Sequence, residues 1–304
     1  MKKLTHSIIL LFSLFTLNAC QASVGLPEKT KPQLVVTYSI MGSIVKELVG
    51  DKAEVVVMIP NGQDPHEWEP SAKEIETITH ADLIIQNGLG LEGGMEKSIN
   101  QAKESGVEIF TASDFIDIRH VKEGEGIPTG DEDQALGAED PHLWTDPVEM
   151  KKIVIGLSEK LDKMGLDVKG NEVVLTGKLD SIDHEIRNLV DRLPEGNRKF
   201  VTGHESMGYF AERYGFKLIG AIIPSLTTQA QVSASDMAAL SKLIKENDVK
   251  AVFTELGTPS AVSDTIGKET GIKVIELSTH QIPDDGSYFT FLRNLAETVI
   301  SGLK

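Results

Sequence analysis

The feature that most constrains the fold is an alternation of short apolar runs with segments of helical periodicity, in two separate blocks of the chain. Such runs are typical of buried parallel strands, because a parallel sheet is covered by helices on its faces. Each block therefore predicts one α/β lobe. We expect strands at 33–39, 53–59, 83–86 and 108–112 in the first block and at 199–202, 218–223, 251–255 and 273–277 in the second.

Between the two blocks lies a long amphipathic segment. Apolar residues recur at helical spacing over 171–193, for about six turns, and Pro194 and Gly196 then end the pattern. We expect one long rigid helix that joins the two lobes. The predicted organisation is an N-terminal α/β lobe at 33–167, a linking helix within 168–196 and a C-terminal α/β lobe at 197–304.

The N-terminus is typical of a secretion signal. Lys2 and Lys3 precede an apolar stretch, 8–17, that is too short to span a membrane comfortably. The stretch ends in Leu-Asn-Ala-Cys, which resembles a bacterial lipobox with Cys20 as the lipidated residue. We therefore predict a signal peptide at 1–19, a lipid on Cys20 and a tether at 20–32. The alternative is a secretory peptide cut nearby, with Cys20 incidental.

The composition excludes several classes of protein. Cys20 is the single cysteine, so the chain has no disulfide framework and no thiolate metal site. The formal net charge of -16 argues against binding to nucleic acid phosphates. No other segment is apolar for long enough to span a membrane. We expect an extracytoplasmic monomer, lipid-anchored to the cell membrane or periplasmic.

Three histidines stand in similar surroundings. His66 and His142 share an Asp-Pro-His-x-Trp frame, and His204 lies in Thr-Gly-His-Glu-Ser. Proline fixes one backbone angle and restricts its neighbour, so each Asp-Pro-His frame presents an imidazole from a stiff loop. Neutral imidazole is a common ligand of zinc and of other borderline divalent ions. The pattern predicts a metal site.

The positions of these residues strengthen the prediction. His66, His204 and His280 each follow a predicted strand, and His142 precedes a predicted helix. Ligands of open α/β sheets bind beyond the carboxyl ends of the strands. The four histidines are therefore expected to converge in the cleft between the lobes. We expect the remaining histidines to be exposed or hydrogen-bonded and not ligands: His6, His80, His120 and His184.

These motifs resemble those of the metal-specific solute-binding proteins of bacterial ABC transporters, which bind zinc or manganese. The resemblance covers nearly the whole chain after Cys20. It implies two α/β lobes joined by one long rigid helix, with the metal between them. It also implies a lipid-anchored or periplasmic protein that hands metal to a permease driven by an ATPase. The segments that carry it are Asp64–Pro70, Ala81–Glu92, Asp140–Trp144, His204–Phe210 and Phe253–Glu255.

In that family the ligands fall on the positions of His66, His142 and His204, with a fourth ligand that is usually Asp. Here His280 occupies the position of that carboxylate. Either His280 is the fourth ligand, or Asp284 or Asp285 reaches in and His280 only contacts the ligands. Imidazole ligands favour zinc, whereas manganese prefers oxygen. We predict Zn2+, with Mn2+ or iron as the alternative.

Two other functions are compatible with parts of the sequence. A zinc hydrolase needs an open metal position and a general base, for which Glu67 and Glu205 are candidates. The chain has no His-Glu-x-x-His helix, and a fourth ligand would close the site, so we do not expect an enzyme. A surface protein of the same fold acting in cell adhesion is the other alternative. The expected partners are the permease, its ATPase and, through Cys20, the membrane.

Overall fold

The computed structural model describes residues 31–125 and 136–304. Residues 1–30 lie outside the described residues. They contain the predicted signal peptide with His6, the predicted lipidation site Cys20 and most of the predicted tether. Within the described part of the chain, no helix combines the length and the apolar character needed to cross a membrane.

The N-terminal lobe is a parallel four-stranded sheet in the order β2-β1-β3-β4. Its central strand β1 pairs with β2 on one side and with β3 on the other, so that Val36 lies between Val57 and Ile85. The crevice between β1 and β3 is the point where the strand order reverses. The elements are β1 (Gln33–Tyr38), α1 (Ser39–Val49), β2 (Glu54–Ile59), α2 (Ala72–Thr79), β3 (Leu83–Gln86), α3 (Glu96–Glu104) and β4 (Glu108–Thr111).

The C-terminal lobe repeats this layout with weaker strand pairing. β5 pairs with β6 and β7 with β8, both in parallel. Since β5 also neighbours β7, the strands follow one another as β6, β5, β7 and β8, the same order as in the first lobe. The elements are β5 (Lys199–Thr202), α6 (Gly208–Tyr214), β6 (Lys217–Ala221), α7 (Ala234–Glu246), β7 (Ala251–Thr254), α8 (Ser260–Thr270) and β8 (Lys273–Glu276).

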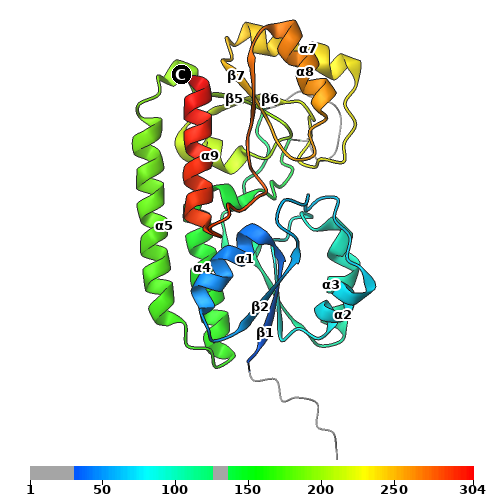
Figure 1. The fold of residues 1–304 in the computed structure, drawn as a ribbon, viewed down its shortest axis with the longest axis vertical. Coiled ribbons are helices and arrows are strands. Elements are labelled where there is room, and N and C mark those ends of the chain that lie inside the picture. The colour runs from blue at the N-terminus through cyan, green and yellow to red at the C-terminus, as the bar shows by residue number, and fades with distance from the viewer. Residues whose placement is uncertain (1–30, 126–135) are drawn as a thin grey trace, which may run out of the picture. The chain divides into compact units, whose positions relative to one another are not determined.

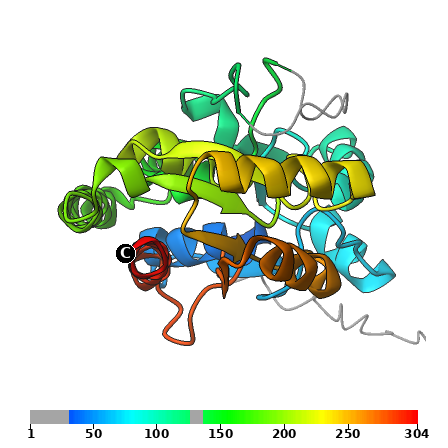
Figure 2. The same cartoon turned by 90° about the horizontal axis from the view of Figure 1, so that it is seen from above.

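Three longer helices lie along one side of the two lobes (Figure 1). They are α4 (Pro147–Lys163), α5 (Lys169–Val190) and α9 (Tyr288–Leu303), and α5 packs against both α4 and α9. Figure 2 shows α5 and α9 at the same side of the lobes when seen from above. The predicted fold class, two α/β lobes with parallel strands, is confirmed, and the long helix α5, which precedes the second lobe in the chain, lies at their side. The helix runs from Lys169 to Val190 rather than over 171–193.

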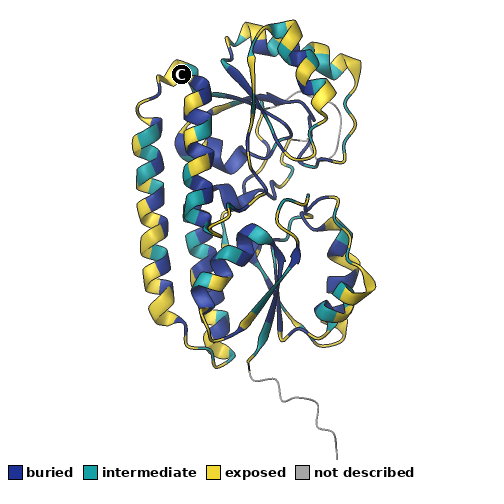
Figure 3. Cartoon of the chain, viewed as in Figure 1, coloured by how far each residue is buried: buried dark blue, intermediate teal, exposed yellow. Residues whose placement is uncertain are grey.

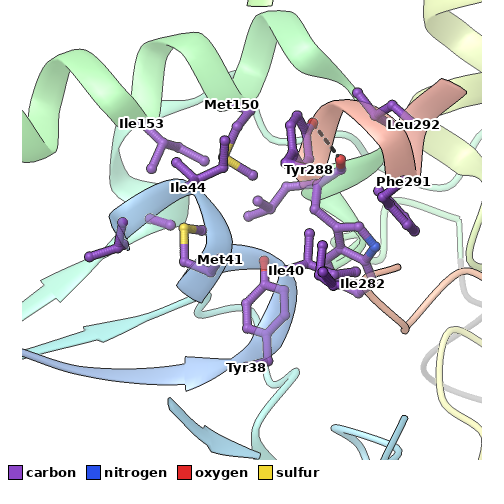
Figure 4. Close-up of a cluster of buried hydrophobic side chains, with 14 of the residues drawn as sticks. Tyr38, Ile40, Met41, Ile44, Met150, Ile153, Ile282, Tyr288, Phe291 and Leu292 are labelled. Carbon is purple, nitrogen blue, oxygen red and sulfur yellow. Dashed lines mark hydrogen bonds between the residues drawn. The ribbon is translucent and has the colours of Figure 1, made fainter. Parts of the chain in front are cut away.

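One continuous apolar core joins the lobes. The dark blue buried faces in Figure 3 turn inward from the strands and the long helices. In Figure 4, Met41 on α1, Met150 on α4 and Tyr288 on α9 belong to the same cluster of buried side chains. Close packing of this kind has low compressibility, so it resists wide hinge motion between the elements that carry the site.

Candidate metal centre

The two Asp-Pro-His frames share one side-chain contact. In each, the aspartate carboxylate accepts a hydrogen bond from the backbone N–H of the histidine two residues later: Asp64 from His66 and Asp140 from His142, both at 2.9 Å. A short polar side chain that binds its own backbone in this way fixes a tight turn. Each turn therefore fixes the backbone from which its imidazole projects.

The second frame has additional support. Oδ1 of Asp140 lies 2.9 Å from Nδ1 of His142, and Oδ2 lies 3.1 Å from the guanidinium of Arg119. Burial opposes ionisation of Asp140, but the contacts with His142 and Arg119 outweigh it and lower the pKa of that carboxyl. A carboxylate on Nδ1 orients the ring and leaves Nε2 free to bind a metal.

His204 is held by a residue distant in sequence. Its backbone N–H donates to Glu255 at 2.9 Å, and its Nδ1 lies 3.1 Å from the same carboxylate. The Nδ1 contact is within ion-pair distance, although it is not aligned as a hydrogen bond. Burial would raise the pKa of Glu255, but His204 and His280 lower it to about 2.

His280 is linked to the same carboxylate through its neighbour. Nδ1 of His280 lies 2.8 Å from Oγ1 of Thr279, and the Thr279 hydroxyl donates to Glu255. Nε2 of His280 is buried and has no hydrogen-bond partner in the structure. A buried polar atom without a partner needs an explanation, and a bound cation is one.

The structure brings the four predicted ligands together. We call His66, His142, His204 and His280 the histidine cluster. One ring nitrogen of each lies within 4.8 Å of those of the others, and all four side chains are buried. Nε2 of His142 is 3.3 Å from that of His66 and 3.0 Å from that of His204. Ring nitrogens this close together can bind a single metal ion.

The surroundings lower the pKa of three of the four imidazoles and so favour the neutral form, which binds metal. Burial holds the pKa of His66 and of His280 well below the usual range, and the other imidazoles add to the effect. Burial also lowers the pKa of His142, although Asp140 opposes it. For His204, burial lowers the pKa but the Glu255 carboxylate raises it more. Neutral imidazole is the ligand form, so three of the four rings are prepared for a cation.

The other sequence candidates lie elsewhere. Asp284 is exposed, and Asp285 is exposed and accepts from Ser287 and Thr290 at the start of α9. Neither carboxylate is in the group that contains the histidine cluster. The three remaining described histidines, His80, His120 and His184, are exposed and also outside that group.

A cavity of about 530 Å³ opens beside His66. Residues of both lobes line it, among them Leu89 from the first and Gln229 from the second. Glu67, the candidate general base, is exposed on this cavity together with two further glutamates, Glu69 and Glu139. Carboxylates at the mouth of a buried site raise the local concentration of cations.

Sequence reasoning missed three groups that support the histidine cluster: Glu255, Thr279 and Arg119. Glu255 was placed inside the predicted strand 251–255, but β7 ends at Thr254 and Glu255 is the first residue beyond it. A charged residue at the end of an otherwise apolar strand was the available signal. Its link to His204 crosses about fifty positions of sequence, which no local pattern reveals.

The comparisons with known proteins identify the family of the chain. Residues 34–302 match the family model described as "Zinc-uptake complex component A periplasmic". The chain belongs to this family. It is therefore the extracytoplasmic, metal-binding component of an ABC transporter, and the family is one of solute-binding proteins.

Individual relatives carry names with different metals. The "Manganese-binding lipoprotein MntA" of Halalkalibacterium halodurans is 26% identical over 100% of this chain and 99% of its own length. The "Iron ABC transporter substrate-binding lipoprotein MtsA" of Streptococcus pyogenes is 28% identical over 99% of each chain. The solved structure of the periplasmic zinc-binding protein TroA of Treponema pallidum superposes with a TM-score of 0.75 at 23% identity, covering 90% of this chain and 99% of its own.

Proposed function

We propose that this protein captures Zn2+ outside the cytoplasm with the histidine cluster and delivers it to a membrane permease driven by an ATPase. The observation that carries the proposal is the convergence of four buried imidazoles with no carboxylate oxygen in the group, as far as the described residues extend. Zinc accepts four nitrogen ligands in a tetrahedron, whereas manganese prefers oxygen ligands and six-fold coordination.

Manganese or iron is the second candidate for the cargo. It is supported by the names of relatives such as MntA and MtsA, which match over nearly the whole chain. A carboxylate that replaced or joined His280 would favour these harder ions. Asp284 and Asp285 are the nearest candidates in sequence, so a change in their loop would be required for them to complete the site.

Competitive calorimetry on the metal-stripped protein separates the two candidates. We expect tight zinc binding, weaker manganese binding and a large loss of zinc affinity in His280→Ala. His184→Ala serves as the matched control, because His184 is exposed on α5 and distant in sequence from every ligand. Preference for manganese, or wild-type zinc affinity in His280→Ala, would contradict the four-imidazole site.

The membrane anchor and the transport role have their own tests. We propose that a lipid on Cys20 holds the protein at the membrane, where it meets the permease. Cys20→Ser should release the protein from the membrane fraction, and deletion of the gene should slow growth when zinc is limiting. Retention at the membrane after Cys20→Ser would favour an incidental cysteine, and unchanged growth would count against transport.

A further inference from the structure

Glu255 is a buried carboxylate that is not itself one of the proposed ligands. It follows β7 directly, at the carboxyl edge of the C-terminal strands, and its side chain is 1% exposed. A charged group removed from water is costly unless it is paired or hydrogen-bonded. Its burial therefore requires compensating contacts, and these contacts point to its role.

The hydrogen bonds of the Glu255 carboxylate come from the loops that carry His204 and His280. The backbone N–H of His204 donates at 2.9 Å, and the hydroxyl of Ser206 lies 2.9 and 2.8 Å from the two oxygens. The Thr279 hydroxyl donates to Oε2. One side chain thus joins two loops that are far apart in sequence and that each present an imidazole.

The turn before His204 is packed tightly onto this carboxylate. A Cβ atom on Gly203 would lie 2.1 Å from Oγ1 of Thr258 and 2.7 Å from Cγ of Glu255. Contacts this short do not occur between real side chains, so only glycine fits at position 203. The close approach keeps the His204 backbone within hydrogen-bond reach of Glu255.

Glu255 and Asp140 differ in the positively charged residues that pair with their carboxylates. Asp140 also contacts a cluster imidazole, but it forms an ion pair with Arg119 at 3.1 Å. Within residues 31–125 and 136–304, no lysine or arginine forms an ion pair with Glu255, and its one cationic partner is His204. A divalent ion held by four neutral imidazoles brings two uncompensated positive charges into a buried site. Glu255 is a carboxylate placed to balance part of that charge.

We propose that Glu255 is a positioning residue that aims Nε2 of His204 and of His280 at the bound ion and supplies buried negative charge to compensate it. This inference rests on the proposed zinc site. When Nε2 of a neutral imidazole binds metal, Nδ1 carries the proton. Nδ1–H of His280 then donates to Thr279, whose hydroxyl donates to Glu255, while Nδ1–H of His204 faces Glu255 directly.

The test uses three variants of the metal-stripped protein. Glu255→Gln keeps the size of the side chain and removes its charge, and Thr279→Val removes the link to His280 while keeping that charge. Glu276→Gln is the matched control, because Glu276 is exposed at the end of β8, in the segment that leads to His280. Zinc affinity is measured by competition with a chelating dye. The visible absorption bands of the Co2+-loaded protein report the geometry of the ligands.

We expect Glu255→Gln to weaken zinc binding by about 10- to 100-fold and to shift the cobalt bands, as is typical when a partner of a metal-bound histidine is removed. Thr279→Val should shift the same bands with about a tenfold loss, and Glu276→Gln should change neither property by more than about twofold. These results support the inference.

Zinc affinity within about twofold of wild type and unchanged cobalt bands in Glu255→Gln and Thr279→Val would overturn the inference. The same holds if the substitutions only lower the melting temperature of the metal-free protein. If Glu255→Gln does not fold, Thr279→Val alone decides between these results. Failure of the wild-type protein to bind zinc would instead overturn the proposed function on which the inference rests.

Discussion

In the N-terminal half of the metal centre, His66 and His142 are each fixed by an aspartate two residues earlier, whereas in the C-terminal half His204 and His280 converge on one distant carboxylate, Glu255. The contact in the N-terminal half is local in sequence and occurs in both Asp-Pro-His frames. The contact in the C-terminal half depends on the packing of three loops. The two halves show that similar ligands can be positioned by sequence-local turns or by a tertiary contact.

Removing one ligand from each half should give the largest effect. If the free energy of structural zinc sites is shared among four ligands, His66→Ala and His204→Ala each lose about 3 kcal/mol of zinc binding, roughly a hundredfold or more. Competition titration measures this loss, with His184→Ala as the control. A loss confined to one half would show that the other half does not bind the ion.

The next largest effects should come from neutralising Asp140 in one half and Glu255 in the other, and the two substitutions should change different properties. Asp140→Asn leaves the buried Arg119 with Glu125 as its remaining close partner, since Glu212 is more distant. We expect a loss of about 3 kcal/mol in the free energy of unfolding of the metal-free protein, because breaking a buried pair leaves a charge poorly compensated. Denaturant unfolding measures it.

Glu255→Gln is the corresponding substitution in the C-terminal half. We expect it to lower zinc affinity more than it lowers the free energy of unfolding. Since Glu255 has no lysine or arginine partner among the described residues, its neutralisation leaves no such cation behind. An Asp140→Asn variant as stable as wild type, or equal destabilisation of metal-free protein by both substitutions, would remove the distinction between the halves.

Acid should weaken zinc binding in two stages, the first set by His204 and the second by the other three histidines. Burial lowers the pKa of His204 but Glu255 raises it more, so zinc must displace a proton from that ring at any pH below this raised pKa. The affinity should therefore fall by about tenfold per pH unit in this range. The lowered pKa values of His66, His142 and His280 delay further proton competition to lower pH, where the fall steepens.

Calorimetry in buffers of different ionisation enthalpy counts the protons released on binding at each pH. The sign is fixed by the ligand chemistry: each ring must lose its proton before it binds, so affinity rises with pH. Zinc affinity that stays constant from neutral pH down to about 5 would contradict ligation by four histidines.

The smallest effect concerns the contact between the halves at the cavity. The side-chain amide of Gln229 donates to the backbone carbonyl of His66 at 2.6 Å, from a loop of the C-terminal lobe. Gln229→Ala should weaken zinc binding by about 1 kcal/mol, the usual net value of one hydrogen bond. Stopped-flow release of zinc to a chelator should show a dissociation rate about fivefold faster. An unchanged rate would mean that this contact does not retain the ion.

The fold and the strand-end positions of three of the four histidines could be predicted from the sequence for the same reason. Alternating apolar runs define parallel strands, and residues that follow such strands lie at the carboxyl edge of their own sheet. This rule places His66 at that edge of the first lobe, and His204 and His280 at that edge of the second. The long helix begins at Lys169 and ends at Val190, a few residues before the predicted bounds at 171 and 193, because apolar periodicity defines the interior of a helix and not its ends.

The roles of Glu255 and Thr279 could not be predicted from the sequence in this way. Thr279 and Glu255 contact each other across 24 positions of sequence, and no local pattern predicts that contact. The pairing of β5 with β6 and of β7 with β8, rather than one continuous hydrogen-bonded sheet, was also not predicted. Both features depend on how loops and strands pack in the C-terminal lobe, where the register of β5 and β6 shifts at Phe200.

The most direct test of the four-imidazole site is a crystal structure of the zinc-loaded protein with anomalous scattering recorded at the zinc edge. The account predicts one peak within the histidine cluster, with four Nε2 atoms at about 2.0–2.1 Å and no carboxylate oxygen bound. A peak at which an oxygen of Asp284, of Asp285 or of water takes the place of His280 would contradict it.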